Sequence, residues 1–311
     1  MVQFHVFTLN PGAYEMRRIS EEAQALGVPI ELYNYRYFSF SVEKGEFNTF
    51  YKERKINFQE KDLIFFRGIP HMSKQLFRHL IGNYFLKCDL VNQYYFTKIP
   101  FLSNKIFQSC YVGKLYPDWV IPFFYFLDKE KLDKSLFSML KEKDFSIFKA
   151  AVGSRGREVF DIRDFEEIGQ MTEKSGKEIY DYQLQKKINN QFDYRVIYLD
   201  GEIVGGIKRI APKDDFRTNI SLGGKAEYFK DLPQEVKNMV LKIADLFKID
   251  YGGIDIIQDL NTGRYYFLEI NFSCQFRGFE RATGINVARK IVEFAWSKMN
   301  SHLTNTNFQI K

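Results

Sequence analysis

GGIDII at Gly252–Ile257 and YYFLEINFS at Tyr265–Ser273 are the two stretches that decide the fold of this chain. Each is a short, mainly apolar run of the kind that forms a buried strand, and the turn signal NTG (261–263) separates them. The two runs therefore predict neighbouring strands of one sheet. Each also carries an acidic residue, Asp255 in the first and Glu269 in the second. A buried carboxylate needs a partner, so both residues are candidates for a functional site.

The polar side chains of these strands predict a site for a hard cation. Successive side chains of a strand point to opposite faces, so we expect Glu269 and Asn271 on one face and Leu268 and Ile270 on the other. With Asp255 on the neighbouring strand they offer only oxygen ligands, a set that suits Mg²⁺ shared with substrate phosphates. Taken alone, the pattern fits equally well a group of buried polar residues that the backbone satisfies.

Composition places the chain among globular proteins of two or three lobes. It has 311 residues, 45% hydrophobic and 27% charged, with a mean hydropathy of −0.33. No apolar run reaches the roughly 18 residues of a membrane helix, and the N-terminal residues lack the features of an export signal. Cys88, Cys110 and Cys274 are scattered and odd in number, which argues against disulfides. We therefore expect a cytoplasmic protein without a membrane partner.

Charge and histidine usage argue against two other classes of function. The formal net charge is +6, and Lys and Arg are spread along the chain, so we expect no specific nucleic-acid partner. The four histidines do not cluster in the sequence, and neither CxxC nor HExxH occurs, which disfavours a zinc site. A polyanionic ligand such as a nucleotide remains compatible with this charge.

The order of the predicted elements indicates an α/β protein. The first hundred residues alternate strand and helix, which predicts a small parallel sheet with right-handed crossovers. Asn104-Lys105 begins a new helix, and Asp200-Gly201 is a favoured two-residue hairpin turn. The predicted strands cover 3–7, 29–33, 61–66, 146–151, 158–162, 182–188, 193–199 and 202–209. The predicted helices cover 14–26, a segment ending near 86, 164–169, 233–247 and 283–299.

A lysine before a glycine-containing turn suggests a phosphate site. Lys149 ends a predicted strand, and the turn Gly153–Gly156 follows it. A lysine next to free backbone N–H groups can hold a triphosphate. The turn matches neither GxxxxGK[ST] nor GxGxxG, and such a sequence by itself is more often a plain hairpin turn.

The order of several motifs carries more information than any one of them. These are NK (104–105), FKAAVGSRGREVF (148–160), LQKKI (184–188), DYRVIYLDGEIVGGIKR (193–209), DFRTNISLGG (215–224) and the two strands at 252–257 and 265–273. In this order they resemble the ATP-grasp superfamily, most of all its RimK-like branch of amino-acid and peptide ligases. The resemblance spans about residues 60–297. It implies α+β lobes: an N-terminal Rossmann-like domain (1–100), a central lobe with a lid loop (101–188) and a C-terminal antiparallel-sheet lobe (189–311).

The resemblance also implies a role for each matching residue. The lysines would contact the ATP phosphates beneath the glycine-rich lid loop, and the backbone of the hinge at 185–188 would recognise adenine. The implied nucleotide-binding residues are Lys105, Lys149, Gly153, Ser154, Arg155, Gly156, Gln185, Lys186, Lys187, Ile188, Asp193 and Arg195. The implied catalytic residues, where the γ-phosphate meets the acyl acceptor, are Lys208, Arg209, Arg217 and Asn219. The implied metal ligands are Asp255, Glu269 and Asn271.

The implied activity is ATP-dependent ligation of a carboxylate to an amine. ATP and two Mg²⁺ ions are the implied cofactors, and Mn²⁺ can substitute for Mg²⁺. The implied substrates are an amino acid, a carrier protein or a peptide, and homo-oligomers are common in the family. Two alternatives stay open: cross-linking of a ribosomally made peptide, and an ATP-binding regulatory protein without turnover. The complete set of metal ligands speaks against the second alternative.

Overall fold

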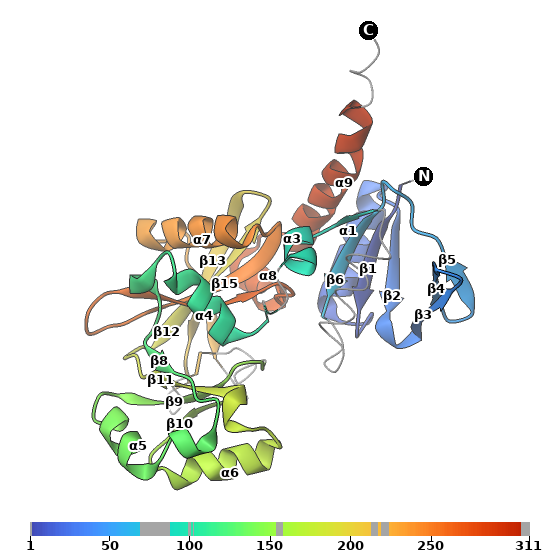
Figure 1. The fold of residues 1–311 in the computed structure, drawn as a ribbon. Helices are drawn as coiled ribbons and strands as arrows, with labels where there is room; N and C mark the ends of the chain where they lie inside the picture. The colour runs from blue at the N-terminus through green and yellow to red at the C-terminus, as the bar shows by residue number, and fades with distance from the viewer. Residues whose placement is uncertain are drawn as a thin grey trace.

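The computed structural model describes residues 2–68, 88–98, 101, 103–153, 158–212, 217–218 and 224–305. Within these ranges the chain forms four sheets, arranged as in Figure 1. The α/β class predicted from the sequence is confirmed, and the boundaries near 100 and 188 remain predictions. The helix expected to end near residue 86 falls outside the described residues. None of the helices in these ranges is long and apolar enough to cross a membrane.

The N-terminal sheet is parallel, with the order β2-β1-β6-β7. All five residues of β1 and of β6 are buried, as expected of parallel strands that are covered on both faces. Helix α1 (Tyr14–Leu26) connects β1 to β2 and ends at Gly27, whose φ of +67° favours glycine. The strands are β1 (Phe4–Thr8), β2 (Ile30–Asn34), β6 (Leu63–Arg67) and β7 (Asp89–Leu90).

A small antiparallel sheet lies at the outer edge of this region (Figure 1). It consists of β3 (Phe38–Glu43), β4 (Glu46–Tyr51) and β5 (Arg54–Ile56). The sequence prediction contained no element here. The alternation of Phe and Ser in β3 is the period-two signal that would have indicated a strand.

The central sheet is antiparallel, with the order β10-β9-β11-β8, and α5 and α6 cover one of its faces (Figure 1). On that face Phe148 stacks on Tyr182 with ring centroids 4.3 Å apart, inside a core of buried hydrophobic side chains. The other face therefore remains for a ligand. The elements are β8 (Phe123–Phe124), β9 (Phe145–Ala150), β10 (Val159–Asp161), β11 (Tyr182–Lys186), α5 (Lys134–Lys141) and α6 (Glu166–Ser175).

The C-terminal sheet is antiparallel, with the order β14-β13-β12-β15-β16. The predicted hairpin turn is confirmed: Asp200 and Gly201 have φ values of +48° and +87°, as a two-residue turn of this kind requires. Helix α7 (Gln234–Phe247) buries its apolar side against the sheet. The strands are β12 (Phe192–Leu199), β13 (Glu202–Ile210), β14 (Lys225–Tyr228), β15 (Tyr251–Gln258) and β16 (Tyr265–Asn271).

The last helical segment differs from the prediction of one helix over 283–299. Helix α8 (Arg277–Thr283) ends at Gly284, whose φ is +72°, and a separate helix α9 (Val287–Asn305) follows. Helix α9 packs against α1 and so joins the C-terminal sheet to the N-terminal one. Two more helices follow the N-terminal sheet: α3 (Gln93–Thr97) lies between the N-terminal and C-terminal sheets, and α4 (Lys105–Gly113) packs against β16 (Figure 1).

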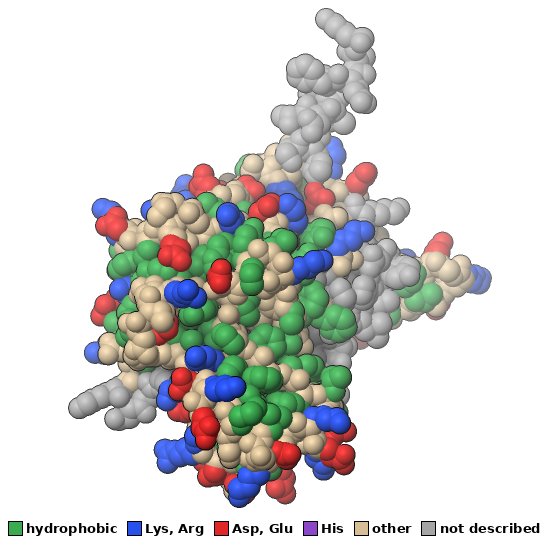
Figure 2. All heavy atoms as spheres, turned by 60° about the vertical axis from the view of Figure 1, so that its left-hand side comes forward, with side chains coloured by type: hydrophobic (Ala, Val, Ile, Leu, Met, Phe, Trp, Pro, Cys, Tyr) green, Lys and Arg blue, Asp and Glu red, His purple; other side chains and the backbone are tan. Residues whose placement is uncertain are grey.

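The charged side chains are interspersed on the face shown in Figure 2. Lysines and arginines lie next to aspartates and glutamates there, and hydrophobic side chains gather across the middle of the face. The formal charge of +6 is therefore not concentrated on this face.

Candidate active site

The two acidic strands pair as predicted, but with a bulge. Asp255 on β15 lies opposite Glu269 on β16, whereas Ile256 lies opposite Phe267, so Leu268 is an extra residue on β16. Leu268 and Glu269 consequently both line the same pocket, while Ile270 is in the core. The expectation that Leu268 shares a face with Ile270 was wrong, because the bulge interrupts the alternation.

The pocket lies between the central and C-terminal sheets and has an apolar part and a charged part. Flat apolar walls suit an aromatic base, and clustered charges suit phosphates and a metal. The apolar residues include Ile121, Ile147, Ile188, Ile257 and Leu268. Of the predicted site residues, those that line it are Lys105, Lys149, Gly153, Gln185, Lys186, Lys187, Ile188, Asp193, Arg209, Arg217, Asp255 and Glu269.

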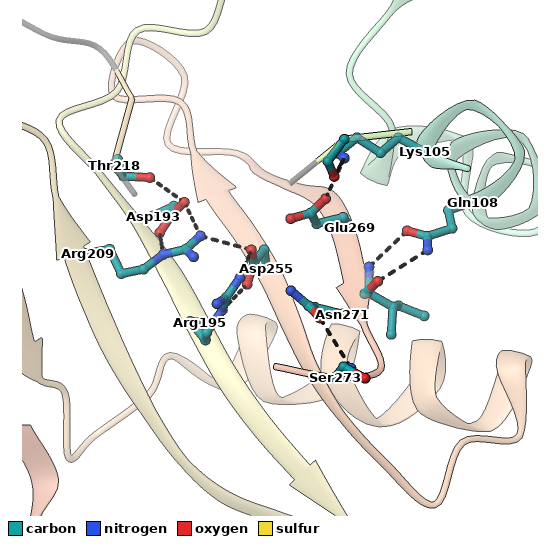
Figure 3. Close-up of polar contacts among 12 residues, drawn as sticks. Lys105, Gln108, Asp193, Arg195, Arg209, Thr218, Asp255, Glu269, Asn271 and Ser273 are labelled. Carbon is teal, nitrogen blue, oxygen red and sulfur yellow. Dashed lines mark hydrogen bonds and ion pairs between the residues drawn. The ribbon is translucent and has the colours of Figure 1, made fainter. Parts of the chain in front are cut away.

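Two arginines hold Asp255 in place (Figure 3). Arg195 donates from Nε and Nη2 to the two carboxylate oxygens at 2.8 and 2.6 Å, and Arg209 donates to Oδ2 at 2.9 Å. Arg209 also binds Asp193 through two hydrogen bonds of 2.6 Å. Burial alone would raise the pKa of Asp255, but Arg195 and Arg209 outweigh it and hold the pKa below its ordinary value. Asp255 is therefore an ionised, oriented carboxylate.

Two lysines give the pocket its positive charge. Helix α4 begins at Lys105 because the Asn104 side chain accepts hydrogen bonds from the N–H groups of Ile106 and Phe107. The Lys105 ammonium lies 3.0 Å from a carboxylate oxygen of Glu269 (Figure 3). The Lys149 side chain is buried, and no hydrogen bond or ion pair holds it in the described part of the chain. Burial and then repulsion from Lys105 lower the pKa of Lys149 to about 8.

A buried ammonium without a partner is costly unless an anion pairs with it. Lys149 therefore points to an anionic ligand in the charged part of the pocket. Together with the apolar walls, this favours a nucleotide over a small inorganic anion.

Asn271 lies beside this pocket and connects it to the N-terminal sheet. Its side-chain oxygen accepts a hydrogen bond of 3.2 Å from the N–H of Ser273 (Figure 3). The Ser273 hydroxyl oxygen accepts one of 2.8 Å from the N–H of Gly68, directly after β6. On the other side of β16, the Gln108 amide of helix α4 bonds both the N–H and the carbonyl of Ile270, at 2.9 and 3.2 Å. The strand that carries Glu269 and Asn271 is thus fixed from two sides.

We expect Ser273→Ala to weaken metal activation. Without the hydroxyl, the bond to Gly68 is lost, and the turn that orients Asn271 is less constrained. The half-saturating Mg²⁺ concentration for ATP turnover should rise up to about ten-fold, as for other residues that orient a metal ligand. The free energy of unfolding should fall by only about 1 kcal/mol. Ser138→Ala, which removes an exposed hydroxyl on α5, is the matched control. An unchanged Mg²⁺ requirement would show that Ser273 does not position Asn271.

Three predicted residues lie outside the pocket. Lys208 is on the opposite face of β13, with its ammonium 4.3 Å from the ring centroids of both Phe192 and Phe229. Its neighbour Arg209 faces the pocket instead, because adjacent strand residues point to opposite faces. Arg195 does not line the pocket and acts on Asp255 instead. Asn271 is the third predicted residue that does not line the pocket. Four predicted residues fall outside the described ranges: Ser154, Arg155, Gly156 and Asn219.

The sequence prediction missed Thr218, which lines the pocket and donates a hydrogen bond of 2.5 Å to Asp193. Its place between the predicted residues Arg217 and Asn219 was the signal that could have indicated it. Leu268 was missed because a β-bulge leaves no signal in the apolar pattern.

The donor set fits Mg²⁺ shared with a substrate. Among the described residues no group of three His, Cys, Asp or Glu side chains is close enough to hold a metal alone. Asp255, Glu269 and Asn271 supply two carboxylates and one amide oxygen on paired strands. Mg²⁺ is commonly held by one or two carboxylates plus substrate phosphates, so a donor set of this kind would be enough if a nucleotide supplied the remaining ligands.

Residues 124–295, more than half of the chain, match the family model described as the RimK-like ATP-grasp domain. The chain belongs to this family. Among curated relatives of this RimK-like protein, the coenzyme gamma-F420-2:alpha-L-glutamate ligase of Methanocaldococcus jannaschii is 35% identical over 150 residues, 47% of this chain and 50% of that protein. The glutamate–LysW ligase ArgX of Sulfurisphaera tokodaii is 32% identical over 161 residues, 48% of this chain and 54% of that protein. The chain spans about half the length of the curated relatives it matches.

Solved structures match the RimK-like chain over nearly its whole length. The ATP-grasp ligase PsnB, complexed with a phosphomimetic variant of a minimal precursor, Mg and ADP, has a TM-score of 0.67 at 17% identity, covering 96% of this chain and 99% of its own. The macrocyclase MdnC of Microcystis aeruginosa, bound with precursor peptide MdnA, has a TM-score of 0.66 at 14% identity. The match covers 94% of this chain and 98% of MdnC. At these identities the likeness shows the fold, which is that of the ATP-grasp ligases.

Proposed function

We propose that this chain is an ATP-dependent carboxylate–amine ligase that forms an amide or peptide bond through an acylphosphate. The observation that carries the proposal is the buried Lys149 ammonium, which faces the pocket without a partner among the described residues. A polyphosphate supplies the missing negative charge, and the apolar walls accept the base. The family to which the chain belongs supports ATP as that nucleotide.

In the proposed reaction, an oxygen of the substrate carboxylate attacks the γ-phosphorus, and the bond to ADP breaks. The amine then attacks the acylphosphate carbonyl, a C–N bond forms, phosphate leaves, and the amine loses a proton. Lys105 and Lys149 hold the phosphates, and Arg217 lines the same charged part of the pocket. Asp255, Glu269 and Asn271 would hold two Mg²⁺ ions, or Mn²⁺ in their place. A bound metal neutralises charge on the transferring phosphoryl group.

No nucleophilic side chain is needed for this chemistry, because ATP itself activates the carboxylate. What the protein contributes is position and fixed charge. The arginine pairs on Asp255 and the lysine on Glu269 supply that fixed charge before substrates arrive. This preorganisation supports a ligase over a regulatory protein that binds ATP without turnover.

A second candidate function is cross-linking within a ribosomally made peptide. What motivates it is that PsnB and MdnC, whose structures contain a precursor or precursor peptide, share the fold of this chain. The sequence matches to the glutamate ligases favour the first candidate, ligation to a separate substrate. An amino acid or a carrier protein remains the alternative substrate. We further propose a cytoplasmic location, because the structure leaves Cys88, Cys110 and Cys274 as free thiols.

The test is ADP and phosphate release with Mg-ATP against a panel of amino acids, carrier proteins and acidic peptides, with product masses read in parallel. A product heavier by one residue less water identifies intermolecular ligation. A peptide that loses one water identifies cross-linking. Tight ATP binding without ADP release on the entire panel would contradict the ligase and favour a regulatory ATP-binding protein.

A further inference from the structure

Glu158 places a negative charge at the phosphate end of the pocket, where the proposed reaction gives it no role. It directly precedes β10 and lines the pocket. Its Oε2 packs against Gly153, since a Cβ on Gly153 would lie only 2.8 Å from that oxygen. The Gly153 carbonyl in turn accepts a hydrogen bond of 3.1 Å from the Lys105 ammonium. An unpaired carboxylate at this place would repel the phosphates that Lys105 is proposed to hold.

The cation that pairs with Glu158 comes from outside the pocket. The other three acidic residues that line the pocket each pair with a cation that lines it too, as Glu269 does with Lys105. Glu158 pairs instead with Lys177, which does not line the pocket. Lys177 can therefore affect a bound ligand through Glu158 without touching the ligand itself.

The end of helix α6 brings Lys177 to this place. The helix ends at Ser175, and Gly176, with a φ of +62°, redirects the chain directly before Lys177. The Lys177 ammonium pairs with the Glu158 carboxylate and donates a long hydrogen bond of 3.4 Å to the carbonyl of Val152. Val152 comes just after β9, and Glu158 comes just before β10. One ammonium thus contacts the chain at the ends of two paired strands.

The Glu158–Lys177 pair matters more for a ligand than for folding. The two side chains are 26% and 24% exposed, and partly exposed ion pairs contribute little to stability. A nucleotide, in contrast, brings several negative charges to the pocket, and an unbalanced carboxylate would repel all of them. When Lys177 balances Glu158, the positive charge of Lys105 and Lys149 remains available to the phosphates.

We propose that Lys177 is a positioning residue of the nucleotide site, which holds Glu158 against Gly153 and cancels its charge. This inference rests on the proposed function, in which phosphates occupy that end of the pocket. It extends the site to a residue that neither lines the pocket nor belongs to the motifs that carry the family resemblance.

ADP affinity, measured by calorimetry with Mg²⁺ on the full chain, tests this role with two substitutions, alone and combined. Lys177→Met should weaken ADP binding on the order of ten-fold, because Glu158 is then an unpaired negative charge beside the phosphates. Glu158→Gln should bind ADP at least as tightly as the wild type. The double variant should bind ADP as tightly as Glu158→Gln, because the charge that Lys177 cancels is gone. Lys177→Arg keeps the cation and should retain the wild-type affinity.

A purely structural role of the pair predicts a different pattern, in which Glu158→Gln and the double variant lose ADP affinity as well. That pattern, or wild-type affinity in Lys177→Met, would overturn the inference. Lys134→Met is the matched control, since it breaks an exposed ion pair with Glu166 and should leave ADP affinity unchanged. Absence of ADP binding in the wild type would instead contradict the proposed function itself.

Discussion

Glu269→Gln is expected to abolish Mg²⁺-dependent ATP turnover while the protein stays folded. The substitution keeps the shape of the side chain and removes the charge that a metal needs, so activity should fall on the order of a hundred-fold or more. The side chain is 25% exposed and its ion pair with Lys105 is at the pocket surface, so the free energy of unfolding should change by no more than about 1 kcal/mol. Initial rates of ADP formation over a Mg²⁺ titration, with circular dichroism of the same samples, measure both effects.

Glu293→Gln is the matched control for this variant. Glu293 is on the exposed side of α9 and pairs with Arg289. Its replacement should leave both ATP turnover and stability unchanged. If Glu269→Gln retained wild-type turnover at limiting Mg²⁺, the assignment of Glu269 as a metal ligand would be wrong.

Lys149→Met should stabilise the ligand-free protein and remove most of its affinity for nucleotides. Burial and repulsion from Lys105 lower the pKa of Lys149 from 10.5 to about 8, which corresponds to about 3 kcal/mol of lost stability at neutral pH. A methionine of similar length has no charge to bury. ADP affinity should fall on the order of a hundred-fold, because a charged hydrogen-bond donor to phosphate is gone. Denaturant unfolding of this variant tests the predicted gain in stability, and calorimetry tests the predicted loss of ADP affinity.

The pH dependence of stability follows from the same group. Between about pH 8 and 10.5, the lysine is protonated in the unfolded protein but largely neutral in the folded one. The unfolded state then binds more protons, so the free energy of unfolding of the wild type rises with pH across this window. The difference in the free energy of unfolding between wild type and Lys149→Met should therefore shrink from pH 7 to pH 10. A constant difference would mean that Lys149 is not buried as an unpaired ammonium.

The core of the site could be predicted because it depends on local patterns. Asp255 and Glu269 each interrupt an apolar strand, and a short turn makes those strands neighbours, so their pairing follows from sequence alone. Asn104 before Lys105 is a helix-capping pattern and correctly predicted the start of α4. The hairpin at Asp200-Gly201 follows from backbone conformations that few residue pairs adopt.

The other features of the site depend on contacts between residues far apart in the sequence, which no local sequence pattern indicates. Alternation shows that Lys208 and Arg209 point in opposite directions, but only the packing of the sheet decides which of them meets the pocket. The bulge at Leu268 changes the face of the sheet to which the side chains of β16 point, and the hydrophobic pattern of the sequence gives no sign of it. The resemblance placed Arg195 among the nucleotide-binding residues, and its partner Asp255 is 60 residues away in the sequence, so no local pattern shows this pair.

The central claim is that the pocket between the two sheets is a site for a nucleotide and Mg²⁺. It is tested most directly by calorimetric titration of the wild-type chain with ADP, in the presence and absence of Mg²⁺. We predict saturable binding with one ADP per chain, tightened by Mg²⁺ and weakened on the order of a hundred-fold in Lys149→Met. If ADP does not bind at millimolar concentration, or if it binds equally well to Lys149→Met, the pocket is not the nucleotide site.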